Sequence, residues 1–142
     1  MPASSTPRCM RTNNPVFFIK TKKMYYVKKT LEISASHRLT LDYESKCENL
    51  HGHNWLITVY CKARTLDQNG MVCDFSVIKR KLNDTLDHKN LNEVFSFNPT
   101  AENMARWIVD NIPGCYRADV RETANNLATY INDEDEQQGN MI

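Results

Sequence analysis

Two segments of the chain alternate apolar and polar residues with a period of two. In residues 25–36 the apolar parity is Val27, Leu31, Ile33 and Ala35, and in residues 55–64 it is Trp55, Ile57, Val59, Cys61 and Ala63. Because successive strand side chains point to opposite faces, this period predicts two strands that each bury one face. No apolar run approaches the roughly 20 residues that a membrane-spanning helix needs, which excludes a helical transmembrane protein.

Two helices are predicted beside these strands. Asp74 is suited to cap a helix whose apolar residues recur every three or four positions, at Phe75, Ile78, Leu82 and Leu86. A second helix begins near Thr100, after Pro99, and ends around Pro113-Gly114, with Met104, Trp107, Ile108 and Ile112 on its apolar side.

Residues 118–124 and 127–131 are predicted as short strands. They are joined at Asn125-Asn126, where Asn tolerates the left-handed backbone of a tight hairpin. The order of elements has no regular alternation of strand and helix, so the fold class is α+β, with an antiparallel sheet covered by helices.

The 142 residues suffice for one domain, which is predicted to span residues 24–131. Residues 1–23 are rich in Ser, Pro and Asn and are expected to form a flexible N-terminal extension, or to lie upstream of a start at Met24. A transit peptide has a similar composition, but the prolines at positions 2, 7 and 15 disfavour the amphipathic helix that it would form. Residues 132–142 are expected to be an acidic C-terminal tail.

The charge and the cysteine content limit which binding partners and which cellular compartment are expected. With 18 basic and 17 acidic residues the net charge is +1, which gives no field that favours nucleic acid. Five cysteines is an odd number for a disulfide framework, and the chain shows no convincing secretory signal. Reduced thiols and a cytoplasmic location are therefore expected.

Three histidines are expected to converge. His51 and His53 are two apart at the entry of a strand and so face one side, while His37 ends the preceding strand, whose antiparallel partner begins near His53. Three imidazoles suit Zn²⁺ with an open fourth position for catalysis. Two alternatives are a pair of polar surface histidines, and a closed structural site in which Cys47, four residues before His51, is the fourth ligand.

Two further sets of polar residues have both a chemical and a structural interpretation. Adjacent Asp87 and His88 could transfer protons, or could simply cap the end of the first helix. Glu122 could accept two N–H groups of an aminopyrimidine ring, or could be an exposed or salt-bridged carboxylate.

Six segments occur in the order typical of one enzyme family. They are SASHRL (residues 34–39), CENLHGHNW (47–55), GMVCDF (70–75), LDHKNLN (86–92), NPTAENMARWI (98–108) and VRETANNLATY (120–130). The chain thus resembles the 6-pyruvoyltetrahydropterin synthase family over nearly all of residues 24–130. The short spacing from Cys47 to His51 resembles the bacterial branch, the 6-carboxytetrahydropterin synthases of queuosine biosynthesis.

The resemblance implies the tunnelling fold (T-fold), a four-stranded antiparallel sheet with two helices on one face. In this family trimers form barrels, pairs of trimers form hexamers, and the active sites lie at subunit contacts. Position by position, the resemblance implies these site residues: His37, His51 and His53 as zinc ligands, Cys47 as the catalytic thiol, Asp87 and His88 as a proton relay, and Glu122 as the pterin anchor. Thr100 and Glu102 match a segment that lines the pterin pocket, although a helix cap and a first-turn carboxylate explain them equally well.

The resemblance also implies a reaction. A zinc-dependent lyase would convert 7,8-dihydroneopterin triphosphate to 6-carboxy-5,6,7,8-tetrahydropterin, acetaldehyde and triphosphate, without nicotinamide or flavin. One alternative is a 6-pyruvoyltetrahydropterin synthase, which eliminates triphosphate. Another is a non-catalytic module that binds a pterin or zinc, which the presence of a thiol and a proton relay disfavours.

Overall fold

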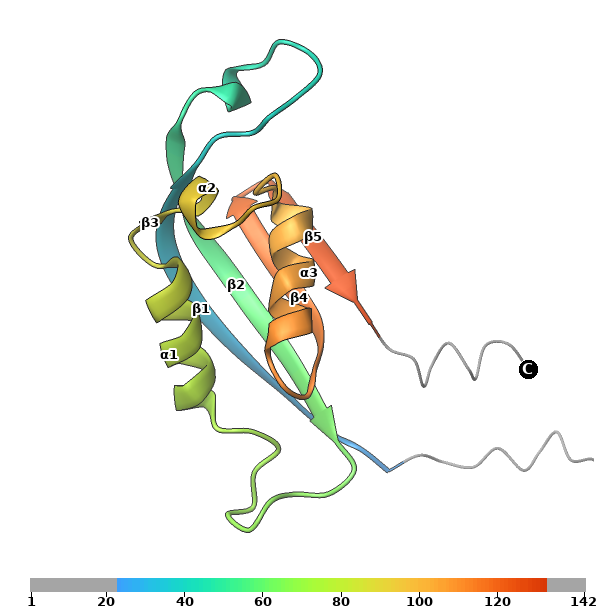
Figure 1. Ribbon diagram of the computed structural model, residues 1–142. Coiled ribbons are helices and arrows are strands. Elements are labelled where there is room, and N and C mark those ends of the chain that lie inside the picture. The colour runs from blue at the N-terminus through green and yellow to red at the C-terminus, as the bar shows by residue number, and fades with distance from the viewer. Residues whose placement is uncertain (1–22, 133–142) are drawn as a thin grey trace, which may run out of the picture.

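Residues 23–132 are described by a computed structural model. Figure 1 shows one sheet with its helices on a single face, so the domain has two layers. The sheet is formed by β1 (Tyr25–His37), β2 (His51–Ala63), β3 (Lys89–Asn90), β4 (Cys115–Thr123) and β5 (Asn126–Ile131), in the order β3-β1-β2-β4-β5. The predicted α+β class, with an antiparallel sheet and helices on one face, is confirmed.

The long pair β1–β2 is the centre of the sheet. The two strands run antiparallel with an unbroken register from Tyr25 opposite Ala63 to His37 opposite His51. β2 and β4 pair antiparallel, as do β4 and β5, whereas β3 adds two residues parallel to β1. The register therefore brings the end of β1 and the start of β2 to the same edge of the domain.

The helices begin where their caps predict. Asp74 caps α1 (Phe75–Leu86) by accepting a hydrogen bond from the Ser76 N–H, and Thr100 caps α3 (Ala101–Asn111) by accepting one from the Asn103 N–H. A four-residue helix, α2 (Leu91–Val94), and a short 3-10 helix, η3 (Lys46–Glu48), complete the fold.

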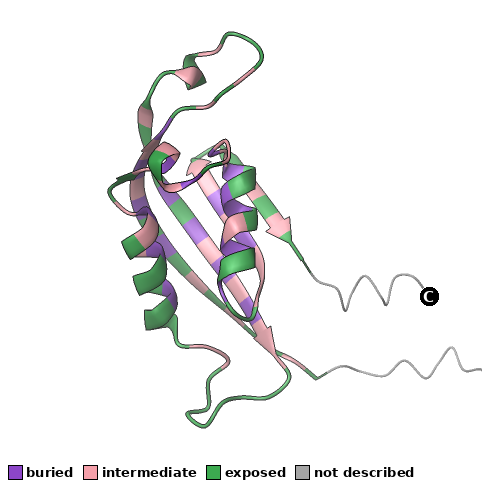
Figure 2. Cartoon of the chain, in the orientation of Figure 1, coloured by how far each residue is buried: buried purple, intermediate pink, exposed green. Residues whose placement is uncertain are grey.

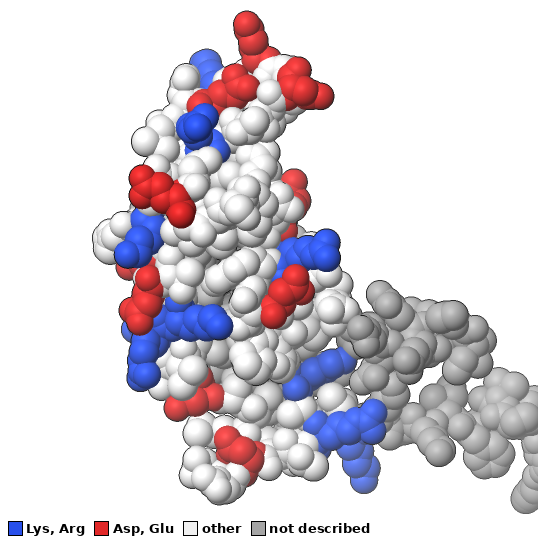
Figure 3. Space-filling model, viewed as in Figure 1, with Lys and Arg blue, Asp and Glu red and all other residues white. Residues whose placement is uncertain are grey.

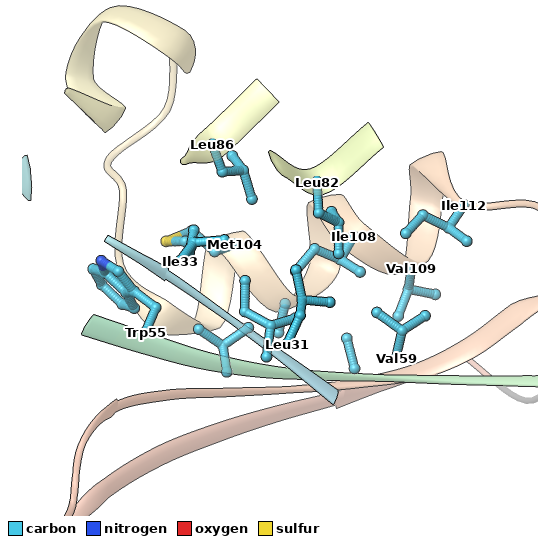
Figure 4. Close-up of a cluster of buried hydrophobic side chains, with 14 of the residues drawn as sticks. Leu31, Ile33, Trp55, Val59, Leu82, Leu86, Met104, Ile108, Val109 and Ile112 are labelled. Atoms are coloured by element: carbon cyan, nitrogen blue, oxygen red, sulfur yellow. The ribbon is translucent and has the colours of Figure 1, made fainter. Parts of the chain in front are cut away.

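The core fills the space between the sheet and the helices, as the positions of the buried residues in Figure 2 and the side chains in Figure 4 show. β1, β2 and β4 each contribute residues of one parity, and α1 and α3 each contribute one stripe, as the sequence pattern predicts. Phe75 is the exception, because it was expected on the apolar face of the first helix and is exposed. The Trp55 indole N–H is also satisfied within this layer, because it donates to the Ala35 carbonyl oxygen at 3.1 Å. The largest hydrophobic side chains that are fully buried are those of Ile33, Trp55, Ile57, Leu82, Leu86, Leu91, Met104 and Ile108.

The structure corrects several boundaries. The second strand begins at His51, four residues before the predicted Trp55, and the fourth begins at Cys115 rather than Ala118. The predicted left-handed Asn in the last hairpin is wrong, since His88 is the one described non-glycine residue with a positive φ. β3, α2 and η3 are too short to leave a periodic pattern, so the sequence did not predict them.

The terminal predictions fall outside the described residues. These are the flexible extension predicted for residues 1–23, of which residues 1–22 are not described, and the acidic tail predicted for residues 132–142, of which residues 133–142 are not described. Within residues 23–132, none of the helices has the length and apolar character needed to span a bilayer. On the face drawn in Figure 3, acidic and basic side chains are interspersed.

Packing against the sheet should account for much of the stability. Leu82→Ala removes a side chain that is 0% exposed, so we expect the free energy of unfolding to fall by about 2–5 kcal/mol in urea titrations. Val77→Ala on the same helix is the control, because Val77 is 53% exposed and its truncation should change stability by less than about 0.5 kcal/mol. Equal losses in the two variants would contradict the assigned core.

Candidate metal centre

Three histidines meet at the edge where β1 ends and β2 begins. His37 lies directly opposite His51, and His53 lies opposite Ala35, two positions along the same face of the sheet. The ring centroids are 4.7 Å apart for His37 and His51, 5.2 Å for His37 and His53, and 4.8 Å for His51 and His53. The predicted convergence of the three imidazoles is thus present in the fold.

Backbone carbonyl groups orient two of these rings. The Nδ1 atom of His37 lies 2.8 Å from the Pro99 carbonyl oxygen, and that of His51 lies 2.6 Å from the Asn49 carbonyl oxygen. A ring nitrogen in such a contact carries the proton, because a carbonyl oxygen can only accept. In the neutral form of either ring, Nε2 would then keep its lone pair, which is the arrangement typical of metal-binding histidines.

Glu122 completes a four-residue group with the histidines. Its Oε1 atom lies 3.2 Å from Nε2 of His37 and 3.0 Å from Nε2 of His53. One potential ligand atom from each of His37, His51, His53 and Glu122 lies within 4.8 Å of all the others. Within residues 23–132 this is the one group of three or more His, Cys, Asp or Glu residues with that geometry.

The donor set fits a divalent metal ion. The Nε2 atoms of His37 and His53 are buried and lack an aligned hydrogen-bond partner in the described structure, although the Glu122 carboxylate is near. Burial lowers the pKa of His53, and the neighbouring histidines lower it further, against the opposing effect of Glu122. Neutral imidazole is the form that binds metal, so this environment suits an ion that accepts nitrogen and carboxylate ligands.

The position of Glu122 beside the imidazoles was not predicted. The residue was expected to anchor a pterin, and the structure places its carboxylate within the potential ligand group. A signal for this was present in the sequence, because Ala118, Val120 and Glu122 share one parity and the first two are buried in the core. The role of Glu122 as pterin anchor stays a prediction.

Cys47 lies outside this group. It is exposed on η3, in the loop that joins β1 to β2, and its backbone N–H donates to Ser45 Oγ at 3.1 Å. Its sulfur is not within ligand distance of the three histidines, whereas the Glu122 carboxylate is. The structure therefore does not support a closed site with Cys47 as the fourth ligand.

Asp87 and His88 are held against the edge of β1. Asp87 Oδ1 accepts a hydrogen bond from the Ser34 N–H at 2.8 Å, and the His88 N–H donates to the Ser34 carbonyl oxygen at 2.7 Å. His88 has the left-handed φ of 58°, which costs a non-glycine residue about 1–2 kcal/mol and is imposed here by the two hydrogen bonds. Its ring is 83% exposed, and its Nε2 lies 3.6 Å from Asp87 Oδ2.

The Asp87–His88 pair is thus not part of the histidine group within a single chain. His88 borders a hollow of about 480 Å³, as does His53 of the ligand group, and the hollow is also lined by Ser34, Ser36 and Asn54. Those three residues have the parity opposite to the buried core residues, so they lie on the sheet face away from the helices.

Thr100 and Glu102 occupy the first turn of α3. The Thr100 side chain caps the helix, and Glu102 is an exposed acidic residue beside the N-terminus. The structural explanation offered for both residues is confirmed, and their pterin-binding role stays a prediction.

Comparison with known proteins points to one family. The family model for 6-pyruvoyl tetrahydropterin synthase matches residues 26–133. A 6-carboxy-5,6,7,8-tetrahydropterin synthase from Synechocystis is 34% identical over 122 residues, which cover 76% of this chain and 94% of the relative. A 6-pyruvoyl tetrahydrobiopterin synthase from Dictyostelium discoideum is 34% identical over 119 residues, covering 68% of this chain and 88% of the relative.

The fold is also that of a solved pterin synthase. The structure of the Caenorhabditis elegans 6-pyruvoyl tetrahydropterin synthase aligns with a TM-score of 0.63 at 27% identity, over 78% of this chain and 96% of the other.

His51→Ala should remove metal binding, because it deletes one of the three ring nitrogens. We expect metal content after dialysis, measured by inductively coupled plasma mass spectrometry, to fall at least about tenfold. His88→Ala is the matched control, since His88 lies outside the ligand group and should leave metal content unchanged. Full metal occupancy in His51→Ala would contradict the assigned site.

Proposed function

We propose that this chain, which belongs to the 6-pyruvoyl tetrahydropterin synthase family, is a zinc-dependent 6-carboxy-5,6,7,8-tetrahydropterin synthase. Its substrate would be 7,8-dihydroneopterin triphosphate, and its products 6-carboxytetrahydropterin, acetaldehyde and triphosphate. The observation that carries the proposal is the group of His37, His51, His53 and Glu122, in which His37 ends β1 before the Cys47 loop and His51 and His53 follow that loop.

Two features favour the carboxy-forming branch over the pyruvoyl-forming one. The relatives from Synechocystis and Bacillus subtilis are both named 6-carboxy-5,6,7,8-tetrahydropterin synthase. Cys47 also precedes His51 by only four residues, the short spacing expected of that branch. The equally identical Dictyostelium relative carries the other name, so a 6-pyruvoyltetrahydropterin synthase is the second candidate.

The three histidines of the centre would hold zinc. The buried ring of His37 and the carbonyl-oriented ring of His51 present Nε2 without further rearrangement. Zinc bound there would lower the pKa of a substrate hydroxyl group and stabilise developing negative charge on its oxygen. The Glu122 carboxylate would either ligate the metal or accept N–H groups from the pterin ring.

Proton transfer would fall to the thiol and the relay pair. The exposed thiol of Cys47 is free to reach a bound substrate and, as a thiolate, could remove a carbon-bound proton from the side chain. Asp87 and His88 would return a proton to the rearranging side chain. Because the His88 ring is 83% exposed on its own chain, the pair would act at a contact with a second copy.

This arrangement agrees with the assembly that the family suggests. We propose a homohexamer built as a dimer of trimers, in which neighbouring subunits complete each active site. Residues 24–131 would form the catalytic domain, and Thr100 and Glu102 would line the pterin pocket. A role in queuosine biosynthesis and a cytoplasmic location complete the proposal.

Product analysis decides between the candidates. The purified zinc-loaded protein is incubated with 7,8-dihydroneopterin triphosphate, and the products are identified by mass spectrometry. Carboxytetrahydropterin with acetaldehyde supports the proposal, and pyruvoyltetrahydropterin supports the second candidate. Binding without conversion would overturn both and favour a non-catalytic module.

Cys47→Ala should separate chemistry from metal binding. We expect turnover to fall by at least about 100-fold while zinc content is retained, because the thiol transfers protons and is not a ligand. Cys73→Ala is the control, since Cys73 is a partly exposed thiol outside the site. Loss of zinc in Cys47→Ala would show instead that the thiol is a ligand.

A further inference from the structure

The backbone of residues 38–40 leaves β1 without a neighbouring strand, yet its polar groups are paired. The Arg38 N–H donates to Asn92 Oδ1 at 2.8 Å, and Asn92 Nδ2 donates back to the Arg38 carbonyl oxygen at 2.9 Å. Asn98 repeats this pattern two residues further along the segment. The Thr40 N–H donates to Asn98 Oδ1 at 2.9 Å, and Asn98 Nδ2 donates to the Thr40 carbonyl oxygen at 3.0 Å.

The two amides therefore act as a substitute strand. A primary amide offers one carbonyl acceptor and N–H donors, which is what a peptide unit offers to a β-ladder. In an extended chain the N–H and C=O groups of residues 38 and 40 point to one side, and those of residue 39 to the other. The asparagines bind the first side, and the Leu39 N–H donates to the Cys47 carbonyl oxygen at 2.8 Å on the second.

Cys47 is thereby connected to the clamped segment. Its carbonyl oxygen accepts a hydrogen bond from the Leu39 N–H, and its own N–H donates to Ser45 Oγ. The position of the thiol therefore depends on the position of the backbone of residues 38–40. The loop that contains it extends beyond the ends of β1 and β2 in Figure 1, where no layer of the domain covers it. Core packing does not fix the thiol, because none of the residues of η3 is buried.

The asparagines themselves are rigidly mounted. Asn92 lies in α2 next to the fully buried Leu91, and its N–H donates to Asn90 Oδ1 at 3.1 Å. The Asn98 carbonyl oxygen accepts from Asn103 Nδ2 at 2.9 Å and from the Thr100 N–H at 2.8 Å. Asn98 also adjoins Pro99, whose carbonyl group orients His37, whereas the hydrogen bonds of Asn92 within residues 23–132 are made to Arg38 and Asn90.

We propose that Asn92 and Asn98 are positioning residues that hold the Cys47 loop in its reactive place by extending the β1 ladder with side-chain amides. The inference rests on the proposed function in so far as Cys47 is the reacting thiol. The clamp itself is a property of the loop and is measurable without substrate.

Asn92 gives the sharper test because, unlike Asn98, it does not adjoin Pro99, whose carbonyl oxygen contacts the His37 ring. The Asn92→Ala variant loses both hydrogen bonds to Arg38, and Asn92→Asp keeps the acceptor for the Arg38 N–H but cannot donate. The control is Asn111→Ala, which deletes a comparable amide-to-carbonyl hydrogen bond of 2.8 Å to Trp107 inside α3. All variants are assayed as the full chain with zinc, after their melting temperatures and zinc contents have been compared with the original protein.

The loop is followed by backbone hydrogen exchange and by trypsin cleavage after Arg38 and Lys46. We expect exchange in residues 38–47 and cleavage at both sites to accelerate at least about tenfold in Asn92→Ala, less in Asn92→Asp, and not in Asn111→Ala. With 7,8-dihydroneopterin triphosphate, kcat should fall about 10- to 100-fold in Asn92→Ala with KM and zinc content unchanged. Asn92→Asp should recover part of that loss.

Unchanged exchange and cleavage in Asn92→Ala would overturn the clamp. Faster exchange with an unchanged kcat would overturn the positioning of Cys47. If Asn92→Ala does not fold, Asn92→Asp decides by the same measurements. An original protein that binds zinc but converts no substrate would refute the proposed function, and exchange would still decide whether the clamp exists.

Discussion

The antiparallel pairing of β1 with β2 is the constraint on which the rest of the structure depends. Its register sets His37 opposite His51 and, by the period of two, places Trp55, Ile57 and Val59 on the same face as those imidazoles. A slip of one residue would turn both the core and the metal ligands to the other face of the sheet. Folding of the core and assembly of the site are therefore specified by the same set of hydrogen bonds.

The site is built where regular structure ends. His37 is the last residue of β1 and His51 the first of β2, so their rings contact carbonyl groups of Pro99 and Asn49 in the adjoining loops. These contacts favour the tautomer in which Nδ1 carries the proton. The cost of burying imidazole nitrogen without an aligned partner is what a bound metal ion would relieve.

Asparagine has a recurring role around this edge of the sheet. Asn90 caps α2, and Asn92 and Asn98 pair with backbone that has no neighbouring strand. An amide side chain can satisfy a peptide group in both directions, so the chain can leave the sheet without exposing unpaired polar groups. A loop stabilised in this way can hold a reactive group in one position even though the group lies outside the core.

The sequence by itself determined the fold class, the two long strands, both helix caps and the three histidines. Each of these follows from a local or periodic pattern, because caps act over three residues and strand parity repeats every two. Only the tertiary structure placed the Glu122 carboxylate on the imidazoles, separated Cys47 from the ligand group and clamped residues 38–40 with Asn92 and Asn98. These contacts join residues more than 50 positions apart. Their pairing depends on how the loops are positioned in space, and loop positions leave no periodic pattern in the sequence.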